Sequence, residues 1–235
     1  MYDAPDMTTT TGARIDDVRR LMGVMTGDEK HGPAATSTLD VLWVLYDQVM
    51  RIDPANPDDP DRDRFFLSKG HGPMAYYATL AATGFVDESW LADWGRFDSP
   101  LGHHPDRTLV PGVEISSGSL GHGLPLAVGA ALGLRAVGRD ARVFVLVGDA
   151  ELDEGSNQEA IELAGFLGLS RLTMVVVDNA SASYRDRGHL ARRLVREGWR
   201  TETVDGRDHG QLRQALWARS DRPSAVVAEV EEKWS

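Results

Sequence analysis

Asp149 and Asn179 are the residues of this sequence whose types and spacing best fit metal binding. Asp149 follows the apolar run 142–147 after Gly148, and Asn179 follows the next apolar run, 172–177, after a single aspartate. A carboxylate and an amide carbonyl provide the hard oxygens that Mg²⁺ or Ca²⁺ prefers, and phosphate oxygens or water can complete the coordination. The pair therefore predicts a metal site that also holds a diphosphate.

A glycine-rich loop and several histidines accompany this pair. Residues 118–123 read Gly-Ser-Leu-Gly-His-Gly, and they precede an uncharged segment that we expect to form a buried helix. Glycines let backbone N–H groups approach phosphate oxygens, and the amino end of a helix adds the positive end of a dipole. His31, His71 and His104 stand in segments rich in glycine or proline. The metal and the loop are predicted to bind one diphosphate from two sides.

The two apolar runs must be neighbouring strands if they are to bring Asp149 and Asn179 together. Both are short and rich in β-branched residues, which is typical of strands buried on both faces of a parallel sheet. Between them, residues 155–169 carry apolar side chains at helical spacing, and Ser156 with Glu159 is predicted to form a capping box. A βαβ unit results. Ligands of open parallel sheets bind beyond the carboxyl ends of such strands.

Strands and helices alternate through the rest of the chain. Further strands are predicted at residues 65–68, 201–204 and 225–229, and further helices at residues 11–25, 37–51, 73–82, 189–197 and 210–218. The predicted fold class is α/β, with a doubly wound parallel sheet and helices on both faces. We expect a flexible tail at residues 1–12 and a single domain over residues 13–235.

Composition excludes several classes of function. The 235 residues carry a formal net charge of −11, so a nucleic acid or an anionic membrane surface would be repelled. Cysteine is absent, which excludes a disulfide framework, a thiolate nucleophile and Cys-ligated zinc in this chain. We read the uncharged segment 115–134 as a glycine loop and a buried helix, not as a membrane span. A cytoplasmic protein is expected.

Several short motifs follow one another in a fixed order. Residues 31–33 read His-Gly-Pro, residues 67–72 Leu-Ser-Lys-Gly-His-Gly, residues 102–106 Gly-His-His-Pro-Asp, residues 117–123 Ser-Gly-Ser-Leu-Gly-His-Gly and residues 148–150 Gly-Asp-Ala. With Asn179 and the Val-Asp-Gly-Arg-Asp of residues 204–208, this ordered set resembles the thiamine-diphosphate enzymes, and among them the N-terminal segment of transketolase. The resemblance covers residues 13 to 230.

The resemblance implies a set of site residues. Asp149, Asn179 and the backbone carbonyl of Ser181 would bind Mg²⁺ or Ca²⁺. His31, His71 and His104 would act in catalysis, facing the thiazolium and the sugar hydroxyls, where neutral imidazole exchanges protons near pH 7. Glu154 would lie near a partner subunit. The residues implied in binding thiamine diphosphate are Gly118, Ser119, Leu120, Gly148, Asp149, Ala150, Glu151 and Asn179.

The resemblance also implies a thiamine-diphosphate-binding fold and a two-component enzyme. Relatives bind the aminopyrimidine ring of the cofactor with a second domain, for which this sequence has no room, so a separate pyrimidine-binding subunit is expected in an α2β2 heterotetramer. The implied reaction is transfer of a two-carbon ketol unit from a ketose, or ketose phosphate, to an aldehyde. A nonstandard sugar or a carrier-bound acceptor in secondary metabolism is the alternative substrate.

Three residues depart from the family pattern. Ala150 replaces the last glycine of Gly-Asp-Gly, and a positive φ at this position would cost an alanine about 1–2 kcal/mol. His103 stands where glycine is usual, and His122 stands where glutamine is usual. We expect these two histidines to alter which substrate the rim of the site recognises.

Other classes of function remain open from the residues alone. The segment 117–121 approximates a nucleophile elbow, which with Asp149 and a later histidine would indicate a serine hydrolase. Asp149, Glu151 and Asp153 could instead serve a Mg²⁺-dependent phosphohydrolase. A non-catalytic subunit that only scaffolds its partner is the third alternative, and it predicts no stabilisation by the cofactor.

Overall fold

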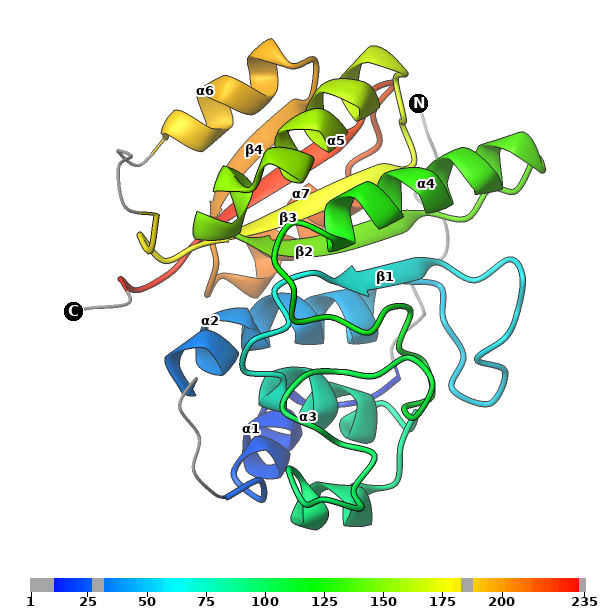
Figure 1. Cartoon of the computed structure of the whole chain (residues 1–235), viewed down its shortest axis with the longest axis vertical. Helices are drawn as coiled ribbons and strands as arrows, with labels where there is room; N and C mark the ends of the chain where they lie inside the picture. Colours follow the sequence, from blue (N-terminus) through cyan, green and yellow to red (C-terminus); the bar gives the residue numbers. More distant parts are fainter. Residues whose placement is uncertain (1–10, 27–31, 183–187, 233–235) are drawn as a thin grey trace.

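The computed structural model describes residues 11–26, 32–182 and 188–232. His31 and most of the predicted tail lie outside the described residues. The fold is built on a five-stranded parallel sheet in the order β1-β2-β3-β5-β4 (Figure 1). The strands are β1 (Arg64–Leu67), β2 (Val143–Gly148), β3 (Leu172–Asp178), β4 (Arg200–Asp205) and β5 (Ser224–Glu229).

Helices cover both faces of this sheet, as the alternating pattern predicted. The α-helices are α1 (Ile15–Met22), α2 (Gly32–Trp43), α3 (Met74–Ala82), α4 (Gly123–Ala136), α5 (Gly155–Phe166), α6 (His189–Arg196) and α7 (His209–Trp217). Three shorter helical turns are η1 (Val44–Val49), η2 (Glu88–Asp93) and η3 (Ala150–Asp153). None of the helices in the described ranges is long and apolar enough to cross a bilayer.

Alternate residues of each strand enter two separate hydrophobic cores. In β2, Phe144 and Leu146 pack with α1, α2, α3 and α7, whereas Val143, Val145 and Val147 pack with α4, α5 and α6. Figure 1 shows α4, α5 and α6 on one side of the sheet and α1, α2 and α3 on the other. Strands buried on both faces read as continuous apolar runs, which is why β2 and β3 are recognisable in the sequence.

The chain reverses direction across the sheet after β4. Helix α6 leads past β5 to β4 at the edge, and α7 leads back to β5 on the opposite face. Crossovers between parallel strands are right-handed, so a reversal of direction moves the connecting helix to the other face of the sheet. This exchange of faces makes the sheet doubly wound.

Candidate active site at the carboxyl edge of the sheet

The ends of β2 and β3 bring Asp149 and Asn179 to one edge of the sheet. Gly148 pairs with Val177, and the N–H of Asp149 donates to the Val177 carbonyl at 3.1 Å. Both polar residues are buried, with Asp149 1% exposed and Asn179 4% exposed. The sequence therefore predicted their proximity correctly.

The carboxylate of Asp149 accepts three hydrogen bonds from the loop that follows β3. The hydroxyl of Ser181 donates to Oδ1 at 2.5 Å, and the N–H groups of Ser181 and Ala182 donate to Oδ2 at 2.6 and 2.9 Å. Hydrogen bonds to an ionised carboxylate are stronger than those between neutral groups. They stabilise the buried negative charge of Asp149.

Asn179, in contrast, has a buried oxygen with no donor. Within the described ranges, its Oδ1 is buried and accepts no hydrogen bond. The next residue, Ala180, has a φ of 53°, and it is the one non-glycine residue of the described chain with a positive φ. Its N–H donates to the carboxylate of Asp178 at 3.1 Å. An unpaired polar atom and a strained backbone therefore occur side by side at the end of β3.

The buried carboxylate of Glu151 connects three segments of the site. Its carboxylate accepts hydrogen bonds from the hydroxyl of Ser68, from the N–H of Gly121 at 3.0 Å and from the N–H of Gly148 at 3.3 Å. Burial raises the pKa of the Glu151 carboxyl above its usual value, while the bonds from Ser68, Gly121 and Gly148 oppose that rise. Ser68 also accepts a hydrogen bond from the N–H of Gly123 at 3.0 Å. Sequence reasoning missed Ser68, although the residue lies inside the motif of residues 67–72.

The glycine loop passes close to other parts of the site at its positive-φ glycines. Gly118 has a φ of 125°, and a Cβ there would lie 2.6 Å from the His104 ring. Gly121 has a φ of 83°, and a Cβ there would lie 2.7 Å from Glu154. Ser119 is exposed and Leu120 is half-buried. Glycine is required at both positions because of the backbone conformation and because of the close neighbours.

The predicted capping box at the start of α5 is wrong. The residue that precedes the helix is Glu154, which makes no side-chain cap, and the hydroxyl of Ser156 instead donates to the Gly121 carbonyl at 2.6 Å. The serine therefore connects α5 to the glycine loop. Its tertiary partner, 35 residues away in the sequence, could not be read from local spacing.

The histidines separate into two groups. The rings of His71 and His104 meet edge to face, with centroids 5.0 Å apart, next to Gly118. His103 turns away from this pair and contacts Trp94, with centroids 5.1 Å apart. His122 is exposed at the start of α4. His103 therefore takes no part in the contact between His71 and His104, and its expected role at the rim of the site stays a prediction.

Ala150 does not carry the strain expected of it. It begins η3 and its φ is not positive, so its methyl group adds no backbone cost. The positive φ that the family pattern suggested for residue 150 occurs instead at Ala180. The departure from Gly-Asp-Gly therefore does not weaken the site through its backbone.

Neither hydrolase alternative gains support from the geometry. The carboxylates of Asp149 and Glu151 are bonded to different segments, and no cluster of three or more His, Cys, Asp or Glu side chains suited to a metal occurs in the described part of the chain. Asp149 bonds to Ser181 and Ala182, and no hydrogen bond from a histidine is among these contacts. An acidic metal cluster and a serine hydrolase triad are both unsupported.

The residues present fit a metal-bound diphosphate. The donor set combines one carboxylate with one unpaired amide oxygen, and it leaves coordination positions for phosphate oxygens. Lys69 adds positive charge at this edge: its aliphatic chain lies against Gly148, where a Cβ would meet Lys69 Cδ at 3.3 Å, and its Nζ donates to the Ser37 hydroxyl at 3.2 Å. Sequence reasoning did not single out Lys69.

Comparison with known proteins places these features in a family. The chain matches the family described as "Transketolase, thiamine diphosphate binding domain" over residues 14–230. It is 55% identical over 217 residues to a protein named "Ferredoxin fas2" from Rhodococcoides fascians, and the aligned region covers 92% of this chain and 71% of that protein. It is 42% identical over 145 residues to an apulose-4-phosphate transketolase subunit from Actinobacillus succinogenes, and this aligned region covers 62% of this chain and 52% of that protein. Among solved structures, transketolase from Leishmania mexicana superposes with a TM-score of 0.76 at 28% identity, over 92% of this chain and 36% of that one.

Proposed function

Because the chain belongs to the transketolase family and matches its thiamine diphosphate binding domain over residues 14–230, we propose that it is the diphosphate-binding subunit of a two-component transketolase-like enzyme. The proposed reaction moves a two-carbon ketol unit from a ketose, or ketose phosphate, to an aldehyde acceptor. Bound thiamine diphosphate supplies the carbon nucleophile that carries this unit. Residues 13–235 form the proposed domain, and the cytoplasm is the proposed location.

The observation that carries this proposal is the buried Oδ1 of Asn179 beside Asp149, which accepts no hydrogen bond within the described ranges. A buried carbonyl without a partner costs about 1–3 kcal/mol, and a bound cation would remove that cost. We assign Mg²⁺ or Ca²⁺ to Asp149, Asn179 and the backbone carbonyl of Ser181. The diphosphate then lies between this metal and the glycine loop.

The glycine loop and the strand end have distinct roles in this proposal. Gly118, Ser119 and Leu120 approach the cofactor from the loop, and Gly148 and Ala150 approach it from the end of β2. The Glu151 carboxylate is already bonded to Gly121 and Gly148. Glu151 therefore acts by holding these two segments at a fixed separation, so that their N–H groups remain aligned.

His71 and His104 are the proposed proton-transfer residues, together with His31. The first two rings lie in contact beside the glycine loop, where each imidazole would face a hydroxyl of the bound sugar. A neutral imidazole there can accept the hydroxyl proton when a carbon–carbon bond breaks and return it when one forms. His103 is not given this role, because its ring lies against Trp94.

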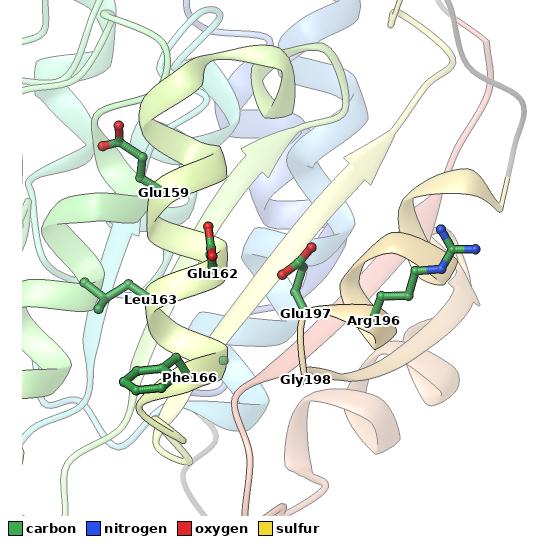
Figure 2. Close-up of a pocket in the computed structure, with 8 residues that line it drawn as sticks. Glu159, Glu162, Leu163, Phe166, Arg196, Glu197 and Gly198 are labelled. Carbon is green, nitrogen blue, oxygen red and sulfur yellow. The ribbon is translucent and has the colours of Figure 1, made fainter.

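An exposed apolar face supports the proposal of a second polypeptide in the enzyme. Helix α4 exposes Leu126, Gly129 and Gly133, and Val137, which directly follows the helix, continues the same stripe. Helix α5 adds Leu163 and Phe166, whose exposures are 45% and 85%. Figure 2 shows these two side chains on the opposite side of α5 from Arg196. An open groove of about 700 Å³ between α5 and the end of α6 is lined by Leu163, Phe166 and Arg196 among others. We call these six residues the α4–α5 face.

The α4–α5 face continues directly from the site. Helix α4 begins at the end of the glycine loop, and α5 begins after Glu154, which contacts Gly121. A protein packed on this face would therefore reach the thiamine end of the cofactor. The Actinobacillus relative is itself named as one subunit of a transketolase. We propose that a separate pyrimidine-binding subunit packs on this face, in an α2β2 assembly.

The identity of the sugar has two candidates. Ordinary ketose phosphates are the first. A nonstandard sugar is the second, and the relative named for apulose-4-phosphate supports it. The name of the Rhodococcoides relative does not extend to this chain, because a ferredoxin cluster needs cysteine ligands and this sequence contains no cysteine.

Cofactor-dependent stabilisation tests the proposal. Thermal unfolding of the full chain should shift upward when thiamine diphosphate and Mg²⁺ are added together, because a ligand that binds only the folded state stabilises it. Asn179→Ala should abolish the shift, whereas Asp153→Ala, at an exposed position four residues after Asp149, should preserve it. A wild-type chain without any shift would indicate a scaffold subunit.

Activity tests the two-component assignment. We expect no ketol transfer by the chain alone, and transfer from a ketose phosphate when the chain is co-expressed with a pyrimidine-binding subunit. Efficient transfer by the isolated chain would contradict the need for a partner. A complex that forms but transfers nothing from ordinary or branched sugar phosphates would contradict the proposed reaction.

A further inference from the structure

The peptide plane between Ser181 and Ala182 has an orientation that bears on metal binding. The N–H of Ala182 points at Asp149 Oδ2, with a nitrogen-to-oxygen distance of 2.9 Å. In a trans peptide the carbonyl of one residue and the N–H of the next point in opposite directions, and every peptide bond of the described chain is trans. The Ser181 carbonyl therefore points away from Asp149 in this conformation.

This orientation keeps the Ser181 carbonyl from facing the same cation as Asp149. Asp149 is covered by the Ser181 hydroxyl and two N–H groups, whose partial positive charges oppose an approaching cation. The Ser181 carbonyl faces elsewhere, and the Asn179 oxygen is buried without a donor among the described residues. Of the two side-chain ligands, Asp149 has its hydrogen-bonding capacity filled in this form of the loop and Asn179 does not.

The backbone next to these ligands is also strained. Ala180 holds a φ of 53°, a region that an alanine occupies at a cost of about 1–2 kcal/mol. The strain is maintained where the surrounding contacts require it, and here the contacts are the three hydrogen bonds to Asp149. In this form of the loop, three hydrogen bonds stabilise Asp149 while Ala180 is strained and the Asn179 oxygen has no partner among the described residues.

We propose that residues 180–182 form a two-state cap on the metal site, in which Ser181 occupies Asp149 until a divalent cation displaces it. Cation binding rotates the 181–182 peptide, so that the Ala182 N–H leaves Asp149 and the Ser181 carbonyl turns toward the cation. The Ser181 hydroxyl holds the metal-free form, and it competes with the metal for Oδ1 of Asp149. This inference rests on the proposed function, since it assumes the metal site.

The cap has a chemical purpose within the proposed enzyme. A buried carboxylate without a partner destabilises a fold by several kcal/mol, so a metal site built on Asp149 alone would leave the chain unstable before loading. The cap allows the chain to fold first and bind its metal afterwards. It also sets the metal affinity, because each hydrogen bond that must break reduces the free energy gained on binding.

Ser181→Ala tests the cap. Mn²⁺ is the probe, and thiamine diphosphate is held at a fixed saturating concentration. Binding is followed by the loss of the electron paramagnetic resonance signal of free Mn²⁺. Losing one hydrogen bond to a charged group should raise Mn²⁺ affinity about tenfold, which corresponds to about 1.4 kcal/mol. The metal-free variant should unfold at a lower temperature than the wild type. Ser170→Ala, an exposed serine before β3 at the opposite end of that strand, is the matched control and should leave both quantities unchanged.

Amide exchange provides a second readout that does not depend on a variant. In the metal-free wild type, the N–H of Ala182 should exchange slowly with solvent, because it is bonded to Asp149. Added Mg²⁺ and thiamine diphosphate should make that N–H exchange faster.

The outcomes separate the cap from the metal site itself. Weaker or unchanged Mn²⁺ binding by Ser181→Ala, or an Ala182 N–H that stays protected in the loaded chain, would overturn the cap and leave the site standing. A wild-type chain that binds no Mn²⁺ with thiamine diphosphate would overturn the metal site and the cap together.

Discussion

At the scale of single residues, Glu151 shows how one buried acid can connect several segments of a site. Its carboxylate joins the segment after β1, the glycine loop and the end of β2 through Ser68, Gly121 and Gly148. Its backbone carbonyl also accepts a hydrogen bond from the Asn157 side chain at 2.8 Å. Three loops that are distant in the sequence therefore share one anchor.

The raised pKa of Glu151 predicts how stability depends on pH. Burial raises the pKa of this carboxyl above its ordinary value of 4.5. The stability that the folded chain gains from holding Glu151 protonated is fully present below pH 4.5, and it is lost as the pH rises through the raised pKa. The free energy of unfolding of the wild type should therefore increase relative to that of Glu151→Gln as the pH is lowered from 7 toward 5.

Denaturant unfolding of both proteins at several pH values in this range measures that difference. Glu162→Gln, on the exposed side of α5, controls for the loss of one negative charge. A difference between the wild type and Glu151→Gln that stays constant, or that grows as the pH rises, would show that burial does not dominate at Glu151.

Residue types indicated the site more reliably than residue conformations. Asp149 and Asn179 were recognisable because each follows an apolar strand, and parallel strands align their carboxyl ends. The strained position was assigned to Ala150 but lies at Ala180, since φ depends on contacts with Asp149 and Asp178 that local sequence does not encode. The orientation of His103 likewise depends on Trp94, which comes from a separate turn of the chain.

At the scale of elements, α4 carries apolar residues and glycines on part of its exposed side as well as on its buried side. Gly129 and Gly133 are exposed, and a Cβ at either position would meet no atom within 4 Å. Glycine in the middle of a helix is destabilising. Nothing in the described part of the chain requires glycine at these two positions, whereas close packing by another subunit would.

Gly129→Ala and Gly133→Ala should therefore have opposite effects on the chain and on the assembly. In the isolated chain each should raise the free energy of unfolding by about 1 kcal/mol, because alanine is the better helix former. In the two-component enzyme each should weaken association of the two components, measurable by sedimentation of their mixture. Gln214→Ala is the control, since it also places an alanine at an exposed helical position but lies on α7, on the opposite face of the sheet. Association unaffected by the α4 variants would remove α4 from the interface.

Elements were predictable where one periodicity dominated. The strands β2 and β3 and the helices α3 and α7 begin and end within a residue or two of the expected positions. The expected helix at residues 37–51 instead begins at Gly32 and changes to the wider turn η1 at Val44. Every described residue of η1 except Gln48 is buried, so tertiary packing decides its geometry and sequence periodicity does not.

At the scale of the whole molecule, the two ends of the sheet differ in chemistry. The carboxyl ends carry the candidate site, and the amino ends are held by a buried ion pair. Arg142 donates to the Asp63 carboxylate from its backbone N–H at 2.8 Å, from Nε at 3.0 Å and from Nη2 at 2.7 Å. Its guanidinium also lies 4.9 Å from the ring centroids of Phe144 and Trp217. This cluster connects β1, β2 and α7.

Asp63→Ala should be among the most destabilising single changes at this end. It leaves Arg142 buried and unpaired, which costs about 3–5 kcal/mol in comparable sites. Asp61→Ala removes an exposed partner of Arg139 two residues earlier and should cost about 1 kcal/mol or less. Chemical denaturation compares the two variants. Equal losses would mean that the Asp63–Arg142 pair is not the element that holds the amino edge.

The order of the strands has a consequence for how the chain is made. β4 pairs with β5 alone, and β5 inserts between β3 and β4 although it comes later in the chain. During synthesis, β4 therefore leaves the ribosome with no strand to pair with, until β5 follows at roughly 5–20 residues per second. For that interval the growing chain presents two open sheet edges, on β3 and on β4, and a nascent chain with open edges is a natural client for a chaperone.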